Sequence, residues 1–477
     1  MNAHLNAVKE AVSPVSEMPV EISAKLAAYA SSFEYAAIPA AVRQRAKYLI
    51  LDSIGVAIAS STYDFAHRTL SGISALAGAG NCSVIAMMQR LPLRDAVLMN
   101  GMLVHGLDYD DTHLGGAVHP TASALPCALG LAEHLDASGE KLLAAYVLGV
   151  EVVTRLGMAG AFGFHHCGFH PTGILGHFSC SLQAGWLLGL GVRQLTMAQG
   201  IVGSTAAASQ EFLADGAWNK RMHPGWAGVA GITAAYLAQG GFLAPSKTYE
   251  GRFGLFKGHL QEREAQVDYG KILAGLGETW ELMATSVKPY PICHFLHACA
   301  DSAIELKRKH GLKPDDIAHI RVVLPKESLP VVAEPETAKL APAHSYDAQF
   351  SAQFVVAASL LLGRFGLAEL QSHVLSDPRI LQLARKVKCA ADTASAFPQY
   401  YSGGVTVVTN DGREFSHHER INRGAGERAL SGAEIESKFL SNALMATTPG
   451  RAEELQDRIL RLERHGARTV AHALAAG

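Results

Sequence analysis

The stretch HGLDYDDTHLGGAVHPTASALP, residues 105–126, places a group of polar side chains directly before an apolar helical pattern. A His-Pro step, His119-Pro120, separates the two parts. Proline forces the preceding residue out of helical geometry and fits the first turn of a helix. We therefore predict a polar loop that ends at His119 and a helix over 121–135. The acidic and imidazole side chains of the loop crowd into six residues: Asp108, Asp110, Asp111 and His113.

Helices are predicted on both sides of this stretch, from about residue 20 to residue 275. Apolar residues recur there at helical spacing, as in the segment after Pro39 that carries Val42, Leu49 and Ile50. Many of these segments are rich in Ala, Gly and Ser, which permit close approach between packed helices. Further helices are expected over 94–107, 139–157, 173–190, 196–213 and 225–240.

After about residue 276 the pattern changes. The segment IAHIRVVLP, 317–325, predicts a strand, and GGVTVVTNDGREFSHH, 403–418, predicts two strands around an Asn-Asp-Gly turn. A mainly α fold follows, in which a smaller α+β domain precedes a final pair of helices over 432–447 and 450–465. Helices of the smaller domain are expected over 294–310, 351–365 and 368–375.

The charge of the 477-residue chain is nearly balanced, with 41 Lys and Arg against 43 Asp and Glu and a formal net charge of −2. Bulk attraction to nucleic acid or acidic membranes is therefore absent, and we expect neither as a partner. A hydrophobic content of 49% predicts a large buried core, and the length of 477 residues predicts about two or three domains. The apolar segment 142–164 is interrupted by Glu151 and Arg155, which favours a buried helix over a membrane span.

The cellular compartment is predicted from the N-terminus and the cysteines. Residues 1–18 lack the basic start and apolar run of a secretory signal and the arginines of a transit peptide. The seven cysteines are odd in number and scattered through apolar sequence, unlike a disulfide framework or a C-x-x-C metal site. We expect a cytoplasmic protein in a reducing environment.

The sequence His-Pro-Thr occurs twice, as His119-Pro120-Thr121 and as His170-Pro171-Thr172. Each histidine should stand at a helix N-terminus, where free backbone N–H groups and a partial positive charge favour anions. Two such ends that face one cavity would favour carboxylate groups. The alternative is that each histidine only caps or packs against its helix.

A metal site is the other interpretation of these polar residues. Asp108, Asp111, His113 and His119 could converge on an ion, although their spacing matches no defined ligand pattern. The segment HHCGFH, 165–170, invites a zinc site, but adjacent histidines point apart on either backbone geometry. We predict no metal, and Asp110, Asp111 and His113 are expected to support the loop.

Two further segments supply cations. The segment WNKRMHPGWAG contains Lys220, Arg221 and His223 in an otherwise apolar region, so these side chains should have partners. The segment SVKPYPICHFLH holds Lys288 before two prolines, which stiffen the chain around a single ammonium. Arg221, His223 and Tyr290, which flank the two lysines, are expected to contact the substrate.

Four motifs in this order, LDYDDTH with HP, FHPTG, KRMHPGWA and KPYPICHFLH, make the chain similar to the MmgE/PrpD family over essentially its whole length. The family contains 2-methylcitrate dehydratases, cis-aconitate decarboxylases and iminodisuccinate epimerases. The resemblance implies a large all-helical domain from residues 20–275 and 425–477 and a smaller α+β lid domain from residues 276–424. It also implies a homodimer and catalysis without metal or organic cofactor.

The decarboxylase members line their pocket with residues that match this chain one by one. The matches are Asp108, Thr112, His119, His170, Lys220 and Lys288. A pocket tyrosine of those members follows the strand equivalent to Ile320–Leu324. This chain has PKESLP there and, with gaps allowed, Leu329. The departure favours another reaction over decarboxylation of cis-aconitate.

The three family reactions share negative charge that develops at a carbon beside a carboxylate. Positioned cations stabilise such a species best in a cleft poor in water. We expect His119 or His170 to act as general base and the other to protonate the leaving hydroxyl. Asp108 would hold a histidine in its required tautomer. Lys288, on the lid, would join Lys220 in binding the substrate carboxylates when the domains close.

The sequence thus predicts a cofactor-independent lyase, a dehydratase of a small hydroxy di- or tricarboxylate such as 2-methylcitrate. An epimerase or isomerase of a dicarboxylate, or a cis-aconitate decarboxylase, would use the same carbanion chemistry. A metal-binding or carboxylate-binding module without turnover is the alternative from a different class.

Overall fold

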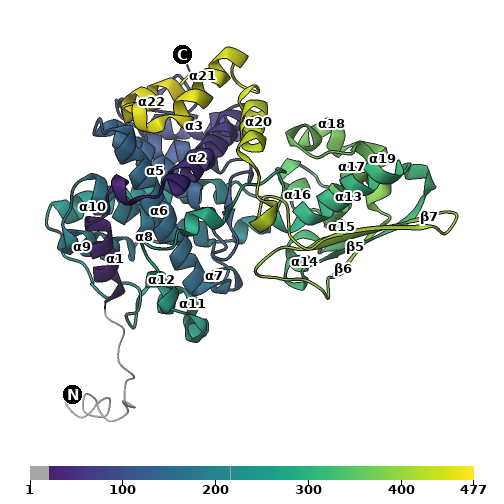
Figure 1. Cartoon of the computed structure of the whole chain (residues 1–477), viewed down its shortest axis with the longest axis horizontal. Coiled ribbons are helices and arrows are strands. Elements are labelled where there is room, and N and C mark those ends of the chain that lie inside the picture. The colour runs from purple at the N-terminus through teal and green to yellow at the C-terminus, as the bar shows by residue number, and fades with distance from the viewer. Residues whose placement is uncertain (1–20, 215, 477) are drawn as a thin grey trace, which may run out of the picture.

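The computed structural model describes residues 21–214 and 216–476. A body of packed helices makes up most of it, and a smaller part with a sheet lies beside the body (Figure 1). The predicted mainly α fold is confirmed. The prediction that residues 1–18 carry no targeting signal lies outside the described residues.

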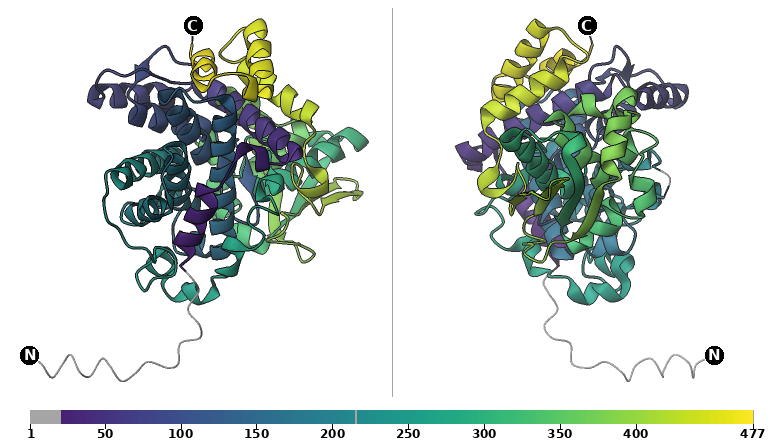
Figure 2. Two further views of the ribbon diagram at one scale, coloured as in Figure 1. Left: turned by 60° about the vertical axis from the view of Figure 1, so that its left-hand side comes forward. Right: turned by 90° about the vertical axis from the view of Figure 1, so that its right-hand side faces the viewer.

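The helical body combines segments from both ends of the described chain. Helices near the C-terminus lie against α2 and α5, which come from the first third of the sequence (Figures 1 and 2). The helices of the body are α1 (Ile22–Ser31), α2 (Ala40–Ser60), α3 (Asp64–Leu76), α4 (Leu93–Val104), α5 (Pro120–His134), α6 (Gly139–Gly160), α7 (Gly163–His166), α8 (Pro171–Leu187), α9 (Val192–Val202), α10 (Asn219–Gln239), α11 (Leu255–Leu260), α12 (Gly270–Leu273), α20 (Gly432–Ala443), α21 (Pro449–Leu460) and α22 (Ala467–Leu474).

The smaller part is built on a four-stranded sheet with strand order β6-β5-β7-β8. Its strands are β5 (Ile317–Leu324), β6 (Val387–Ala391), β7 (Gly403–Thr409) and β8 (Glu414–Glu419). β5 and β6 are parallel, and the other two pairs are antiparallel. The predicted strand and hairpin are confirmed, and Gly412 takes the positive φ of 84° that the turn requires. β6 was not predicted.

Helices cover the sheet and fill the connections of this part. α13 packs against β7 and β8, and α17 packs against β6 and α13. The helices are α13 (His297–His310), α14 (Leu329–Val332), α15 (Glu336–Lys339), α16 (Ser345–Gln349), α17 (Ala352–Leu362), α18 (Ser372–Leu375) and α19 (Pro378–Ala384).

Three of the predicted helices differ from the structure in more than the position of their ends. The helix predicted over 368–375 is divided into a 3-10 turn, Leu367–Leu370, and the short α18. The helix predicted over 196–213 ends at Val202, since Gly203, Ser204 and Thr205 form a turn after it. The helix predicted to begin at Gly225 begins at Asn219, and Pro224 lies inside it. His223-Pro224 is therefore not a helix start like the other two His-Pro steps.

Two large hydrophobic cores divide the chain differently from the boundary predicted at residue 276. Leu282 and Val287 still belong to the core of the helical body, and the second core consists of residues from Tyr290 onward together with Phe212. The reason is a short ladder, in which β4 (Thr285–Ser286) pairs with β3 (Thr112–His113) of the body. A second short ladder joins β1 (Cys82–Ser83) and β2 (Arg90–Leu91).

Helix α6 is long and apolar enough to cross a membrane by length and composition. Nevertheless, 94% of its most apolar window is buried inside the protein, as expected of a core helix. Glu151 and Arg155 pair within it, and the guanidinium also donates hydrogen bonds to the carbonyls of Ala274 and Thr279. All seven cysteines, which lie in the described part of the chain, are free thiols.

The glycines allow the close helix approach that the composition predicts. Where α4 crosses α10, a Cβ atom on Gly101 would lie 2.3 Å from the Cα atom of Gly225. No side chain fits at this crossing, because the backbones themselves are in contact.

We expect Gly101→Ala to destabilise the protein by about 1–3 kcal/mol, the usual effect of overpacking a close-packed core. Gly72→Ala, in α3, is the matched control, because a Cβ atom there meets nothing within 4 Å. The control should stabilise the helix by about 1 kcal/mol, the difference in helix propensity. Urea unfolding of the two variants tests this, and equal midpoints would contradict it.

Candidate functional site

The polar loop between α4 and α5 is buried, and side chains from distant segments satisfy its backbone. Five of its carbonyl oxygens accept hydrogen bonds of 2.6–2.9 Å from side chains. The pairs, carbonyl first, are Gly106 with Arg221, Leu107 with Gln349, Asp108 with Lys288, Tyr109 with Lys438, and Asp111 with His119. A buried carbonyl without a donor is costly, so these bonds fix the path of the loop.

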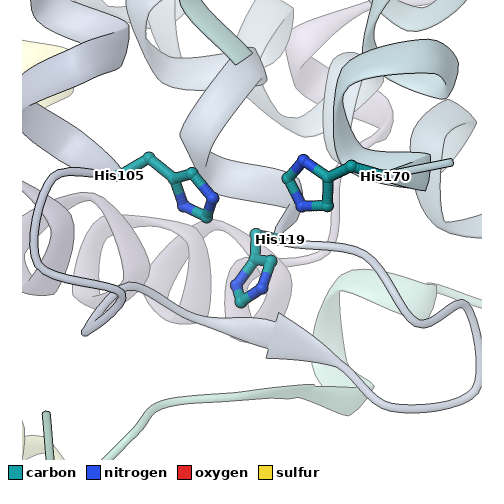
Figure 3. Close-up of side chains that lie close together, drawn as sticks. All are labelled: His105, His119 and His170. Atoms are coloured by element: carbon teal, nitrogen blue, oxygen red, sulfur yellow. The ribbon is translucent and has the colours of Figure 1, made fainter. Parts of the chain in front are cut away.

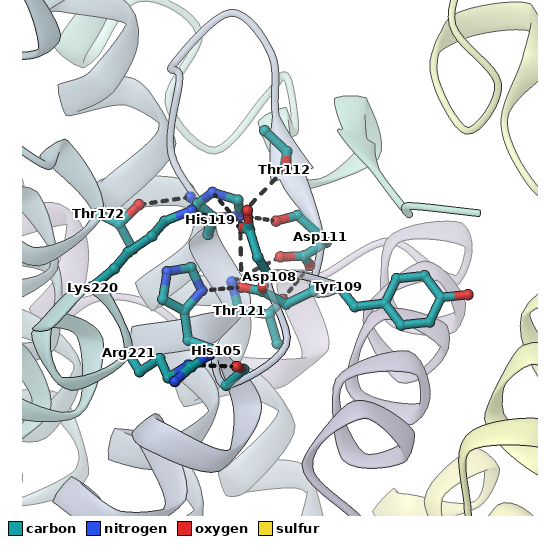
Figure 4. A network of polar contacts seen from close by, with 12 residues as sticks. His105, Asp108, Tyr109, Asp111, Thr112, His119, Thr121, Thr172, Lys220 and Arg221 are labelled. Carbon is teal, nitrogen blue, oxygen red and sulfur yellow. Dashed lines mark hydrogen bonds and ion pairs between the residues drawn. The ribbon is translucent and has the colours of Figure 1, made fainter. Parts of the chain in front are cut away.

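Asp108 joins the two lysines that the sequence singles out, and Figure 4 shows it beside one of them, Lys220. Its Oδ1 atom lies 2.8 Å from Lys220 Nζ and 3.1 Å from Lys288 Nζ. The residue adopts a left-handed backbone with a φ of 49°, which Asp tolerates better than most residues. In this conformation both its carbonyl and its carboxylate reach Lys288.

This geometry corrects the role predicted for Asp108, which was to hold a histidine in one tautomer. The nearest histidine atom, His119 Nε2, lies 3.8 Å from Oδ1, beyond hydrogen-bond distance. Lys288 also differs from prediction. It follows β4, which is paired to the body, so its ammonium already lies beside Lys220 without any closure of a lid.

His119 is the N-cap residue of α5, as the His-Pro step predicts. Its Nδ1 atom lies 2.8 Å from the carbonyl oxygen of Asp111, which can only accept. Nδ1 therefore carries the hydrogen in the neutral ring, and Nε2 has a free lone pair. The backbone N–H of His119 donates to the hydroxyl of Thr172, which ties the two His-Pro motifs together.

His170 caps α8 and faces His119 and His105 (Figure 3). The rings of His105 and His170 are stacked, with centroids 5.5 Å apart, and the rings of His105 and His119 lie 4.8 Å apart. Behind them, His170 Nδ1 is 3.1 Å from Nδ1 of His223, so one of the two donates to the other. Sequence reasoning missed His105, although it begins the polar stretch.

The remaining polar residues of the loop support it. Asp110 accepts a 2.8 Å hydrogen bond from His105 Nδ1. Asp111 accepts from the backbone N–H and the hydroxyl of Thr121 in the first turn of α5, the pattern of a helix cap. His113 Nδ1 accepts from the backbone N–H of Gly116.

Burial and neighbouring charges set the protonation states. Burial by itself would raise the pKa of Asp108, but Lys220 and Lys288 outweigh it and hold that pKa well below its ordinary value. Burial lowers the pKa of His119 to about 3, against the opposing effect of Asp110. Burial, followed by the charge of Lys220, also lowers the pKa of His170. Both histidines are therefore neutral near pH 7.

Donor atoms that could hold a metal ion also meet here. Nitrogen atoms of His105, His119 and His170 lie within 4.8 Å of one another. The two ammonium groups that share Asp108 would repel a divalent cation at this position. The histidines could bind a metal ion and the lysines oppose one, so catalysis without a metal stays a prediction.

A cavity of about 470 Å³ lies over these groups. It brings together six of the predicted residues: Asp108, Thr112, His119, His170, Lys220 and Lys288. The other three predicted residues are not part of its wall. Arg221 is bonded to the carbonyl of Gly106 and lies over the ring of Phe65, His223 lies behind His170, and the hydroxyl of Tyr290 donates to Asp301.

Residues that were not among the nine predicted site residues complete the wall of this cavity. Most are aromatic or imidazole side chains that come from connections far apart in the chain. They include Phe162, His165, His166, Phe212, His294, Phe295, Phe350, Phe397 and Tyr401. Leu329 does not line the cavity, but its neighbours Glu327, Pro330 and Val331 do.

Comparison with known proteins gives the family. The MmgE/PrpD N-terminal domain matches residues 24–268, and the MmgE/PrpD C-terminal domain matches residues 290–464. The chain belongs to the MmgE/PrpD family. It is an enzyme of that type, and the resemblance found in its motifs is confirmed.

Similar proteins include several cis-aconitate decarboxylases. The chain is 29% identical to cis-aconitate decarboxylase of Homo sapiens over 421 residues, which cover 84% of this chain and 83% of that protein. It is 26% identical to cis-aconitate decarboxylase of Aspergillus terreus over 466 residues, 93% of each chain. It is also 26% identical to cis-aconitate decarboxylase-like protein oryM of Aspergillus oryzae over 462 residues, 93% of this chain and 94% of that one.

The protonation state of Asp111 makes stability depend on pH. Burial, reinforced by Asp110 and Asp52, raises its pKa from 3.8 to about 8. The folded protein therefore holds the proton more tightly than the unfolded chain does. The stability gained from that proton is complete below about pH 4 and is lost as the pH rises through 8.

We expect the free energy of unfolding to fall between pH 5 and pH 8.5 in the native protein. The fall should be a few kcal/mol larger than in Asp111→Asn, since each unit of pKa shift corresponds to about 1.4 kcal/mol. Denaturant unfolding at the two pH values measures the difference. Asp136→Asn, at an exposed position, is the control and should keep the native pH dependence. An unchanged pH dependence in Asp111→Asn would disprove the assignment.

Proposed function

We propose that the protein is a cofactor-independent lyase that abstracts a proton beside a substrate carboxylate. Its leading reaction is dehydration of a small hydroxy di- or tricarboxylate such as 2-methylcitrate. The observation that carries the proposal is the juxtaposition of two buried ammonium groups, Lys220 and Lys288, with the free Nε2 atom of His119. One group of residues can therefore bind a carboxylate and accept a proton from the adjacent carbon.

The lysines stabilise the charge that develops. When a substrate carboxylate lies against Lys220 and Lys288, the enolate-like species formed by proton loss places more charge on its oxygens. Fixed ammonium groups in a buried site stabilise that charge without reorganisation, an effect of roughly 3–4 kcal/mol for one donor. The N-termini of α5 and α8 add partial positive charge on the same side of the cavity.

His119 acts as the general base. Its hydrogen is held on Nδ1 by the carbonyl of Asp111, so Nε2 is the atom that takes the proton. The low pKa of the free ring keeps it neutral and ready to accept. An anionic substrate beside the ring raises this pKa, because a nearby negative charge favours the imidazolium form. The base therefore becomes stronger when substrate is bound.

His170 donates a hydrogen bond to the leaving hydroxyl. When His223 Nδ1 donates to His170 Nδ1, the hydrogen of His170 is on Nε2. That atom is buried and has no hydrogen-bond partner among the described residues, so it is available to a substrate group. Elimination of water needs a base for the carbon-bound proton and a proton for the leaving hydroxyl. His119 accepts the proton from carbon and passes it to the hydroxyl, which leaves as water, while the neutral N–H of His170 holds that hydroxyl in place by a hydrogen bond.

Decarboxylation of a cis-aconitate-type substrate is the second candidate, favoured by the decarboxylase relatives. It would use the same lysines and would need only proton delivery after carbon dioxide leaves. The pocket tyrosine that the decarboxylase members have after the strand equivalent to β5 is absent from that position in this chain. Tyr401, from the connection between β6 and β7, lines the cavity instead.

One experiment separates these reactions. The purified protein is incubated in heavy water with citrate, 2-methylcitrate, cis-aconitate and amino-dicarboxylates, and the products are followed by NMR. An alkene product from a hydroxy acid supports dehydration, and loss of carbon dioxide supports decarboxylation. Deuterium exchange without elimination identifies an epimerase. No change in any compound would contradict the proposal.

We expect Lys288→Ala to lower kcat/KM by at least about 100-fold, the usual effect of losing one donor to a developing anion. Lys257→Ala, at an exposed position away from the cavity, is the matched control and should keep native activity. Circular dichroism and thermal unfolding establish that both variants are folded. Native turnover in a folded Lys288→Ala protein would exclude the assignment.

We also propose a homodimer. One face of α10 exposes Met222, Trp226, Thr233 and Leu237, which follow one another at helical spacing, and Trp218 precedes them. Large apolar side chains that gather on one helix face favour a protein interface. Since Lys220 lies in the first turn of α10, this interface would also steady one wall of the site.

We expect Trp226→Glu to shift the protein toward monomer, because a charge replaces an apolar side chain at the centre of the stripe. Sedimentation velocity at micromolar concentration measures the shift. Phe253→Glu changes an 83% exposed ring outside α10 and is the control. A native protein that sediments as a monomer, or a variant that sediments as the native dimer, would refute this interface.

A further inference from the structure

The cavity has two regions of different chemistry. Its polar region holds Lys220, Lys288, His119, His170 and Asp108, where the proposed function places the substrate carboxylates. Its volume of about 470 Å³ is within the range of roughly 300–1,000 Å³ found for pockets that bind drug-sized ligands. A six-carbon acid bound to the lysines would therefore leave much of the cavity unfilled.

The second region, here called the aromatic arm, is formed by Phe162, Phe295, Phe397 and Tyr401. Ring centroids of Phe162 and Phe397 lie 5.0 Å apart, those of Phe295 and Tyr401 4.8 Å, and those of Phe397 and Tyr401 5.6 Å. Phe162 follows α6 of the helical body, and the other three residues come from the smaller part. Both parts of the chain therefore build this wall.

The rings of the aromatic arm leave apolar surface uncovered in the cavity. Tyr401 is buried, but Phe162, Phe295 and Phe397 are only partly buried and line the cavity. Ring surface that faces water is unfavourable, and an apolar ligand group would remove it from water. Phe162, Phe295 and Phe397 pack against a small core of Leu114, Tyr401 and Ala425, and the ring surface that this core leaves uncovered is available to a ligand.

Aromatic rings also reach the polar region itself. The ring of Phe350 lies 5.6 Å from Lys220 Nζ, and the ring of Phe212 lies 6.2 Å from that of His170. Tyr401 contacts His294 edge-on at 5.7 Å, at the border of the two regions. An apolar substituent on a carbon near the bound carboxylates would therefore contact the side of the cavity that these rings form.

We infer that the substrate carries, on the carbon skeleton that bears its carboxylates, an alkyl chain of several carbons or an aryl ring that fills the aromatic arm. The inference rests on the proposed function, because it takes the lysines as the carboxylate site. It narrows the proposed substrate class, for which 2-methylcitrate was the example, to carboxylates whose apolar substituent is larger than a methyl group.

Binding of three racemic dicarboxylates tests this inference without reference to turnover. Isothermal titration calorimetry is carried out on the full chain with 2-methylsuccinate, 2-butylsuccinate and 2-benzylsuccinate, which have the same two carboxylates. Each methylene that becomes buried strengthens binding by about fourfold. The three additional methylenes of 2-butylsuccinate should therefore lower Kd by at least tenfold and up to about 60-fold. The benzyl compound should bind more tightly than the methyl compound by at least tenfold.

Variants locate the apolar group. Phe397→Ala should weaken 2-butylsuccinate and 2-benzylsuccinate by at least fivefold and leave 2-methylsuccinate within twofold of native binding. Phe162→Ala is the second variant, used if thermal unfolding shows that Phe397→Ala is not folded. Phe253→Ala, on an exposed ring away from the cavity, is the matched control and should bind all three compounds as the native protein does.

The outcomes separate this inference from the proposed function. Equal Kd values for the three compounds, or tightest binding of 2-methylsuccinate, would overturn the apolar substituent and leave the carboxylate site intact. Failure of all three compounds to bind would overturn the carboxylate site and, with it, both proposals. Lys288→Ala should weaken all three compounds by the same factor, since it acts on the carboxylates alone.

Discussion

The structure depends on the hydrogen bonds that side chains donate to the backbone carbonyls of residues 106–111. The loop is irregular and buried, so it cannot satisfy its own carbonyls as a helix or sheet would. Arg221, Gln349, Lys288 and Lys438 each donate to a different carbonyl in it. Because Lys288 also pairs with the carboxylate of Asp108, a bond that lets the loop fold also places positive charge in the site. Fold and site therefore share one set of interactions.

These donors also explain why distant segments must assemble around one loop. Arg221 comes from α10, Gln349 from α16 of the smaller part, and Lys438 from α20 near the C-terminus. Lys438 in addition forms a 2.7 Å ion pair with Asp52 of α2, a carboxylate that is completely buried. Removal of such a cation would leave a buried charge unpaired, a loss of about 3–5 kcal/mol. The last helices of the chain are thus needed by the site as well as by the core.

The sequence predicted what local chemistry determines. The two His-Pro steps placed His119 and His170 at helix starts, and the Asn-Asp-Gly turn placed the hairpin of β7 and β8. It did not predict what long-range contacts determine. The β3–β4 ladder has two residues in each strand and leaves no periodic signal, yet it anchors Lys288 to the body. The aromatic arm is assembled from separate connections, and only the folded chain brings those rings together.

The electrostatics of the site depend on which carboxyl group is charged. Asp108 is ionised because two ammonium groups face it, and Asp111 holds a proton because burial and neighbouring carboxylates oppose its charge. A carboxylate bound to the same lysines would add negative charge to the site, where Asp108 Oδ1 already lies 3.8 Å from His119 Nε2. The ring is neutral without substrate and becomes a stronger base beside it. In the mechanism proposed above, binding of the substrate anion would therefore also make His119 a stronger base.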